Sequence, residues 1–359
     1  MTVHQRMKPA RAGSRARRRP QNLALSSGVF LMCGLLCEVV LRIAGYGNLE
    51  IYEPDARLYW RLKPNQDCYT KVDRRPVHIN SRGTRGSEFA GEKPANTIRS
   101  LSLGDSRTFG WGLADDETYS SRLEKSLQQF LESAAATNGA QGVARSVARR
   151  VEVINAGVNA WSYPQMMVFY RDVAVAWQPD FVILADANLW TQFSEMNDPE
   201  FVRKFMSRVR LKNFLRRFAL YHYVVEVRLK EFYERNRTKF IPVDPRQDQL
   251  FKDQQQKDPD AAFREAIEGI CRTAGTNQVP IMLVFLPTLD ELQSMNPSPV
   301  LRAKRVVSAK LAVPLVDLSP DLAAGKALYL DADPVHLNAQ GNEIVARRLF
   351  DIISAQLRR

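Results

Sequence analysis

Two patterns of hydrophobic and polar positions alternate along most of this chain. After residue 96, five short apolar runs typical of buried strands alternate with stretches in which apolar residues recur three and four positions apart. The runs are residues 98–103, 151–154, 181–185, 281–286 and 313–316. Such alternation is typical of a parallel sheet with helices on both faces. We therefore expect an α/β fold, a three-layer α/β/α sandwich around a five-stranded, mainly parallel sheet.

A longer apolar stretch precedes this region. Residues 23–41 are interrupted by polar Ser26, Ser27 and Glu38, and their number is close to the ~20 residues that cross a bilayer. The first 20 residues hold seven Arg or Lys and no acid, which predicts a cytoplasmic N-terminus. We expect a basic cytoplasmic tail (1–22), a transmembrane signal anchor (23–43) in the inner (plasma) membrane, and a periplasmic or extracellular remainder.

Two alternatives for the apolar stretch stay open. It could be a signal peptide that is removed, or a helix buried in a soluble domain. Glu38 and Arg42 favour an anchor, because their i, i+4 spacing lets them pair near the membrane interface.

The net charge of +12 is concentrated in two places. Residues 1–20 carry +7 and residues 201–240 carry +9, so the rest of the chain has a net charge of −4. A broad basic surface for nucleic acid is therefore not expected. We expect neither a metal nor another cofactor, because no set of ligands has metal-binding spacing. Cys68 and Cys271 could form one disulfide in an oxidising compartment, which the sequence does not decide.

The chain divides into further segments by composition. Residues 44–96 are rich in Pro, Gly and charge and predict a linker with a small cap, and residues 97–357 predict the α/β domain. Residues 190–262 interrupt this domain as an insertion. Within it, residues 201–218 place apolar side chains on one helical face among basic ones, a pattern that suits either anionic lipid headgroups or a helix packed on the domain.

Chemistry is indicated by residues that follow the predicted strands. Ser106 comes directly after the first strand, and His336 lies three positions after Asp333 before the last helix. A serine hydroxyl becomes a good nucleophile when an imidazole takes its proton and a carboxylate orients that imidazole. Asp331 is an alternative orienting carboxylate, although spacing favours Asp333.

Four blocks carry a resemblance to a known family. The sequence reads GDSRTFG around Ser106, NAGVNAWS around Gly157, ADANLW around Asn188, and DPVH at the end. These blocks resemble those of the SGNH (GDSL-like) hydrolases, which implies a flavodoxin-like sheet. The resemblance also implies Ser106 as nucleophile, His336 as base and Asp333 as its partner. Ser106, Gly157 and Asn188 would form the oxyanion hole. Asp186 and Leu189 depart from the usual third block, which reads glycine-x-asparagine-aspartate.

Four side chains beside these blocks are candidates for lining the substrate cleft. Arg107 follows the nucleophile and could contact an anionic substrate or lie along the surface. Trp111, Trp161 and Trp190 each follow one block closely and could face a sugar ring or an acyl chain. Core packing is the alternative for these tryptophans.

We therefore expect a serine esterase that removes an acyl group, with O-acetyl the expected one, from an envelope glycan, polysaccharide or lipid. One alternative is an O-acyltransferase in an exported-polysaccharide pathway, in which a sugar hydroxyl replaces water. Another is a non-catalytic envelope module that retains the fold. The sequence leaves the substrate and the oligomeric state open.

Overall fold

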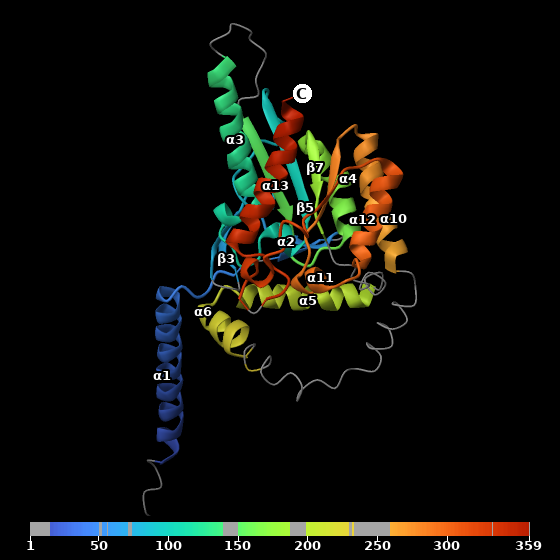
Figure 1. Ribbon diagram of the computed structural model, residues 1–359. Helices are drawn as coiled ribbons and strands as arrows, with labels where there is room; N and C mark the ends of the chain where they lie inside the picture. The colour runs from blue at the N-terminus through green and yellow to red at the C-terminus, as the bar shows by residue number, and fades with distance from the viewer. Residues whose placement is uncertain are drawn as a thin grey trace, which may run out of the picture.

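A computed structural model describes residues 15–49, 52–55, 57–70, 74–138, 150–186, 199–229, 232, 259–331 and 333–358 (Figure 1). Its centre is a five-stranded parallel sheet in the order β6-β5-β7-β8-β9. The strands are β5 (Thr97–Gly104), β6 (Arg150–Gly157), β7 (Phe181–Leu184), β8 (Ile281–Phe285) and β9 (Leu315–Asp317). Counted along the chain, this is the doubly wound order 2-1-3-4-5. The predicted sheet and its five strands are confirmed.

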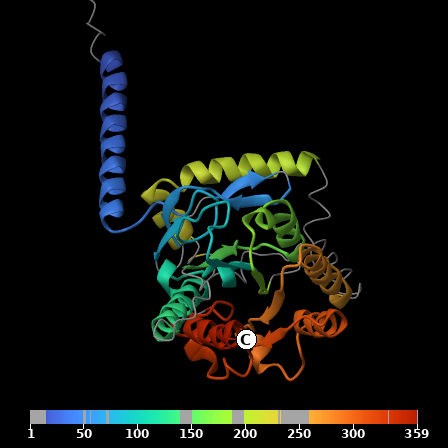
Figure 2. The ribbon, with the colours of Figure 1, turned by 90° about the horizontal axis from the view of Figure 1, so that it is seen from above.

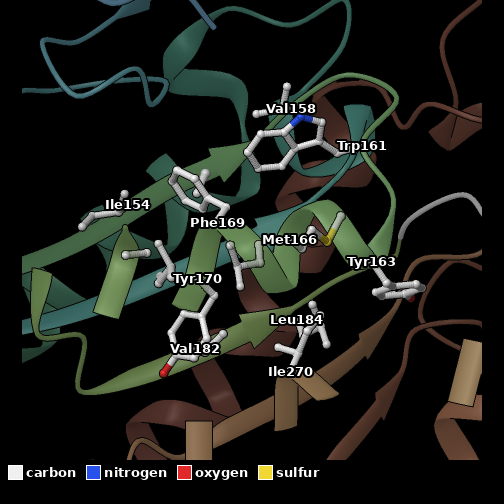
Figure 3. Packing of buried hydrophobic residues seen from close by; sticks show 14 of the residues in the cluster. Ile154, Val158, Trp161, Tyr163, Met166, Phe169, Tyr170, Val182, Leu184 and Ile270 are labelled. Carbon is white, nitrogen blue, oxygen red and sulfur yellow. The ribbon is translucent and has the colours of Figure 1, made fainter. Parts of the chain in front are cut away.

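Both faces of the sheet are buried by helices. In β8, alternate residues pack into two separate clusters, with Leu283 in one and Val284 in the other. Helices α3 (Tyr119–Asn138) and α13 (Ala339–Leu357) cover one face, and α4 (Tyr163–Asp172), α10 (Pro259–Thr276) and α12 (Pro299–Leu311) cover the other. This arrangement explains why the strands read as continuous apolar runs. Figure 3 shows the cluster that includes Leu283, where side chains of α4 such as Met166 and Phe169 meet the sheet.

The residues before the sheet form two antiparallel hairpins. They are β1 (Tyr52–Asp55) with β2 (Tyr59–Leu62), and β3 (Gln66–Tyr69) with β4 (Pro76–Ile79). Leu62, Val77 and Ile79 belong to the same hydrophobic core as α4 and α10. These hairpins therefore share the core of the α/β domain. Short helical elements complete it: α2 (Ser106–Phe109), η1 (Asp115–Glu117), η2 (Ala174–Trp177), α11 (Leu289–Gln293) and η6 (Gly325–Leu328).

One long helix extends away from the domain. This helix, α1 (Arg15–Ile43), contains the one span, Ala24–Ile43, that is apolar and long enough to cross a membrane among the described residues. None of that span is buried. Residues 199–229 of the insertion form α5 (Pro199–Leu215), α6 (Ala219–Tyr221) and the π-helix η5 (His222–Leu229). In both Figures 1 and 2, α5 borders the domain on the side toward which α1 extends.

Candidate active site

Ser106 lies at the start of α2, directly beyond the carboxyl end of β5. Asp105 caps this short helix, because its side chain accepts a hydrogen bond from the Arg107 N–H at 2.9 Å. Gly104 permits the tight connection, since a Cβ there would lie 1.9 Å from Thr108 Oγ1. The Ser106 N–H has no hydrogen-bond partner among the residues that the structure describes. The hydroxyl is therefore held at the sheet edge where ligands bind in doubly wound folds.

His336 and Asp333 complete a hydrogen-bonded chain with Ser106. The His336 Nε2 atom lies 2.8 Å from Ser106 Oγ, and His336 Nδ1 lies 2.7 Å from Asp333 Oδ2. Ser106 is half-buried, and 15% of the His336 side chain is exposed. The three side chains thus have the order and spacing that activate a serine hydroxyl, and water can reach them.

The turn that carries the histidine is fixed from both sides. Asp333 Oδ1 accepts hydrogen bonds from the N–H groups of Val335 and His336, and Leu330 N–H donates to the His336 carbonyl. Burial alone would raise the pKa of Asp333, but the hydrogen bonds from His336 and from this backbone lower the pKa overall. Asp331 is exposed and has no such contact with the imidazole among the described residues, so the geometry favours Asp333.

Of the two oxyanion donors predicted besides Ser106, Gly157 lies within the described residues. The Gly157 N–H donates to Asn155 Oδ1 at 3.1 Å, so it is already engaged within the protein. Gly157 also lies against α2, where an added Cβ would sit 2.2 Å from the Phe109 nitrogen. Its lack of a side chain is thus required for packing against the nucleophile turn. Asn188 and Trp190 lie outside the described residues.

The Arg107 side chain is buried, which corrects the expectation that it lies along the surface. Only 7% of its side chain is exposed, and it donates to Asp105 at 3.1–3.2 Å and to the Leu286 carbonyl at 2.9 Å. Burial acts to lower the pKa of Arg107, but the carboxylates of Asp105 and Asp186 raise it overall. The guanidinium stays charged and serves the interior.

Asp186 and Lys304 extend this buried group of charges. Both side chains are fully buried and hydrogen-bonded to each other, and Lys304 also donates to the Val284 carbonyl. Burial raises the pKa of Asp186 and lowers the pKa of Lys304. At position 186, where the usual third block has glycine, this chain therefore has a buried carboxylate that pairs with Lys304.

Two of the three tryptophans predicted to line the cleft, Trp111 and Trp161, lie within the described residues, and their positions differ. Trp111 is half-buried, and its ring centroid lies 5.8 Å from that of His336, so it lies beside the triad. Trp161 is 1% exposed, packs on Phe169 and donates from Nε1 to the Trp60 carbonyl at 2.9 Å (Figure 3). Trp161 is thus a core residue, and its predicted place in the cleft was wrong.

Sequence reasoning missed Arg85, which holds the loop after α2. This residue is 4% exposed and donates to the carbonyls of Phe109, Gly110 and Leu113. The Asn155 amide likewise donates to the Thr108 carbonyl at 2.9 Å. No motif marks Arg85, because its value depends on carbonyls that only the fold brings near it.

Two cavities lie away from Ser106. One, of ≈ 410 Å³, runs along β6 between Arg85 and Glu124, and another, of ≈ 450 Å³, lies between β8 and α10. Neither cavity includes Ser106, and we assign the chemistry to this serine because it is hydrogen-bonded to His336. Cys68 and Cys271 are both buried and free, so the possible disulfide is not formed. Burial raises the pKa of the Cys271 thiol to about 12, which leaves it unreactive.

The sequence matches no family model and no curated protein. Solved structures do resemble the chain. An α/β-hydrolase enzyme from the metagenome of Lake Arreo, Spain, is 14% identical with a TM-score of 0.40, over 71% of this chain and 94% of that one. A two-domain esterase active on acetylated mannans is 13% identical with a TM-score of 0.42, over 74% of this chain and 50% of that one.

A lipase/acylhydrolase from Enterococcus faecalis is 16% identical with a TM-score of 0.38, over 72% of this chain and 97% of that one. Other structural neighbours are described as a G-D-S-L family lipolytic protein and an acetyl xylan esterase. At these identities, the likeness concerns the fold alone.

Proposed function

We propose that this protein is a serine esterase of the SGNH type that forms an acyl-enzyme on Ser106. The observation that carries the proposal is the continuous chain of hydrogen bonds from Ser106 Oγ through both ring nitrogens of His336 to Asp333. The four sequence blocks support the same assignment, because they place these residues in the family's order.

The first half of the reaction uses the imidazole as a base. His336 Nε2 takes the Ser106 proton while Oγ attacks the ester carbonyl, and a tetrahedral oxyanion forms. The Ser106 N–H is available to this oxyanion, and we assign the Asn188 amide to it by the family resemblance. Each such donor is worth ~3 kcal/mol of barrier in studied enzymes. The imidazolium then protonates the leaving alcohol as the carbon–oxygen bond breaks, and acyl-Ser106 remains.

The second half returns the enzyme to its starting state. Water gives a proton to His336 as it attacks the acyl carbonyl, and the carboxylic acid leaves as Ser106 regains its proton. Asp333 holds Nδ1 throughout and stabilises the imidazolium. Trp111, beside the imidazole, is proposed to line the acyl or alcohol side of the cleft.

The proposed substrate is an O-acetyl ester on a glycan, polysaccharide or lipid of the cell envelope. The proposed setting is a single pass through the inner membrane, with the N-terminus in the cytoplasm and the domain outside it. The basic residues before the Ala24–Ile43 span support that orientation.

The test uses the full-length protein and a fluorophosphonate probe that bonds to activated serines. We expect labelling of the wild type and of Ser121→Ala, a half-buried serine on α3, and none of Ser106→Ala. Hydrolysis of p-nitrophenyl acetate should fall at least ~10³-fold in Ser106→Ala alone. Equal labelling of all three would overturn the assignment of Ser106. If the wild type is labelled but releases p-nitrophenol only when a sugar alcohol is added as acyl acceptor, the protein is an acyltransferase instead.

A further inference from the structure

The insertion is attached to the end of the transmembrane candidate helix by specific hydrogen bonds. The two carboxylate oxygens of Glu38 accept the N–H groups of Ala219 and Leu220, each at 2.9 Å, at the start of α6. Arg42 donates to the same carboxylate at 2.8 Å and to the Arg217 carbonyl at 2.8 Å. Glu38 and Arg42, two polar side chains near the end of α1, therefore bind the insertion.

A second group of contacts strengthens this junction just beyond α1. The Gly47 N–H donates to Nδ1 of the buried His222 at 2.9 Å. The Tyr46 ring meets the rings of His222 and Tyr223 edge-on, with centroids 5.3 and 5.1 Å apart. These contacts make α1 and the insertion one packed unit.

The helix α5 has one inner and one outer side. Asn213 donates to the Tyr52 carbonyl, and the buried Arg216 lies over the Tyr52 ring, so these residues face β1. Leu211 and Phe214 point outward, with 60% and 55% of their areas exposed. Within residues 207–229, the exposed large apolar residues are Leu211, Phe214, Phe218, Leu220, Val224 and Leu229.

Exposed cations lie on the same segment, residues 207–229, as these apolar side chains. They are Arg208, Arg210, Lys212, Arg217 and Arg228. A segment that exposes both apolar side chains and cations suits the boundary between acyl chains and anionic headgroups. We call the exposed residues of 207–229 the platform.

We propose that the platform lies in the headgroup region of the bilayer that α1 crosses and so holds the catalytic domain at a fixed orientation to the membrane. Its depth follows from Glu38, which lies five residues before Ile43, the end of the apolar span. That separation is about 8 Å along a helix. Because Glu38 binds the start of α6, the platform lies at a level within the 5–10 Å zone that interfacial helices occupy.

A bilayer is the occupant that the position of the platform favours. The apolar side chains of α1 are exposed up to Ile43, directly beside the platform. In Figures 1 and 2, α5 lies along the border of the domain, and its direction is crosswise to that of α1, as expected of a helix in the plane of the membrane. The membrane that covers α1 therefore also reaches the platform.

Photolabelling from within the bilayer tests this proposal. Full-length protein in vesicles of phosphatidylcholine with phosphatidylglycerol is exposed to an apolar diazirine that partitions into the lipid, and adducts are mapped by mass spectrometry. We expect adducts on residues 207–229 as well as on α1. Phe218 and Leu357 form a matched pair, since both are 39% exposed, and Leu357 is the last residue of α13, whose C-terminal end lies far from α1 (Figure 1).

The outcomes separate cleanly. Adducts on Phe218 and none on Leu357 support the platform, whereas adducts confined to α1, or equal on the two residues, overturn it. Glu38→Ala removes the acceptor that binds α6, so labelling of residues 219–229 should fall at least about twofold while labelling of α1 is unchanged. Unchanged labelling of residues 219–229 in Glu38→Ala would refute Glu38 as the residue that sets the depth. Because the readout is independent of Ser106, failure of the esterase proposal would leave this result interpretable.

Discussion

Two charged groups meet near the nucleophile and behave in opposite ways. The triad of Ser106, His336 and Asp333 is reached by water, with 15% of the His336 and 23% of the Asp333 side chain exposed. The buried group consists of Asp105, Arg107, Asp186 and Lys304, and no member exceeds 7% exposure.

The difference lies in how the charges are balanced. The buried group sets two carboxylates against two cations, so it is neutral as a whole. Charges without water persist only when they are paired and hydrogen-bonded. The triad instead includes a side chain whose protonation must change during the reaction, and that requires access to solvent. Proximity to the nucleophile therefore does not by itself make a charged residue catalytic.

The largest expected effect is a loss of esterase activity without a matching loss of stability, on replacement of His336. His336→Gln keeps a polar side chain but removes the base, so we expect kcat/KM for p-nitrophenyl acetate to fall about 10⁴-fold or more. The free energy of unfolding should change by less than about 1 kcal/mol, because the side chain is partly exposed. A loss of stability that accounts for the loss of activity would mean that the triad is structural.

The next effect concerns the buried group. Lys304→Met leaves the Asp186 carboxylate without its lysine partner, and we expect the free energy of unfolding to fall by about 3–5 kcal/mol. Urea denaturation of the detergent-solubilised protein, followed by tryptophan fluorescence, measures it.

Arg305→Met is the matched control for Lys304→Met. The neighbouring Arg305 pairs with Asp317 at 3.2 Å on the surface, and 53% of its side chain is exposed. Its loss should cost less than about 1 kcal/mol. Equal costs for the two variants would remove the contrast between buried and exposed pairs. Adding Asp186→Asn to Lys304→Met should recover part of the stability, because the uncompensated charge disappears.

The smallest effect is a pH dependence in the triad. The pKa of Asp333 is lowered in the folded protein, so its ionised form contributes stability that is fully present above the unfolded pKa of about 3.9. That contribution is lost as the pH falls through the lower folded value. We therefore expect the Tm difference between wild type and Asp333→Asn, measured from pH 5 downwards, to narrow below about pH 4. A difference that widens over this acidic range would contradict the sign of the shift.

Sequence predicted correctly those features that depend on a short stretch of residues, such as the strands and the DPVH turn. The continuous apolar runs of the strands required two buried faces, and the structure has both. The DPVH turn placed Asp333 within reach of His336, because a carboxylate three residues before a histidine can bond to both its backbone and its ring. Burial was the quantity that sequence could not supply. Arg107 and Trp161 both follow active-site blocks, yet their side chains turn inward.

The sequence by itself determined the α/β architecture, the apolar span and the residue types that a nucleophile, a base and an orienting acid require. These properties follow from periodicity and side-chain chemistry, which are local. Only the tertiary structure decided that Ser106 and His336, 230 residues apart, lie 2.8 Å from each other. It also decided that Gly157 packs on α2 and that Glu38 binds the insertion. Such contacts depend on the order in which strands join the sheet and on the direction each side chain takes there, and neither is written in a short stretch of residues.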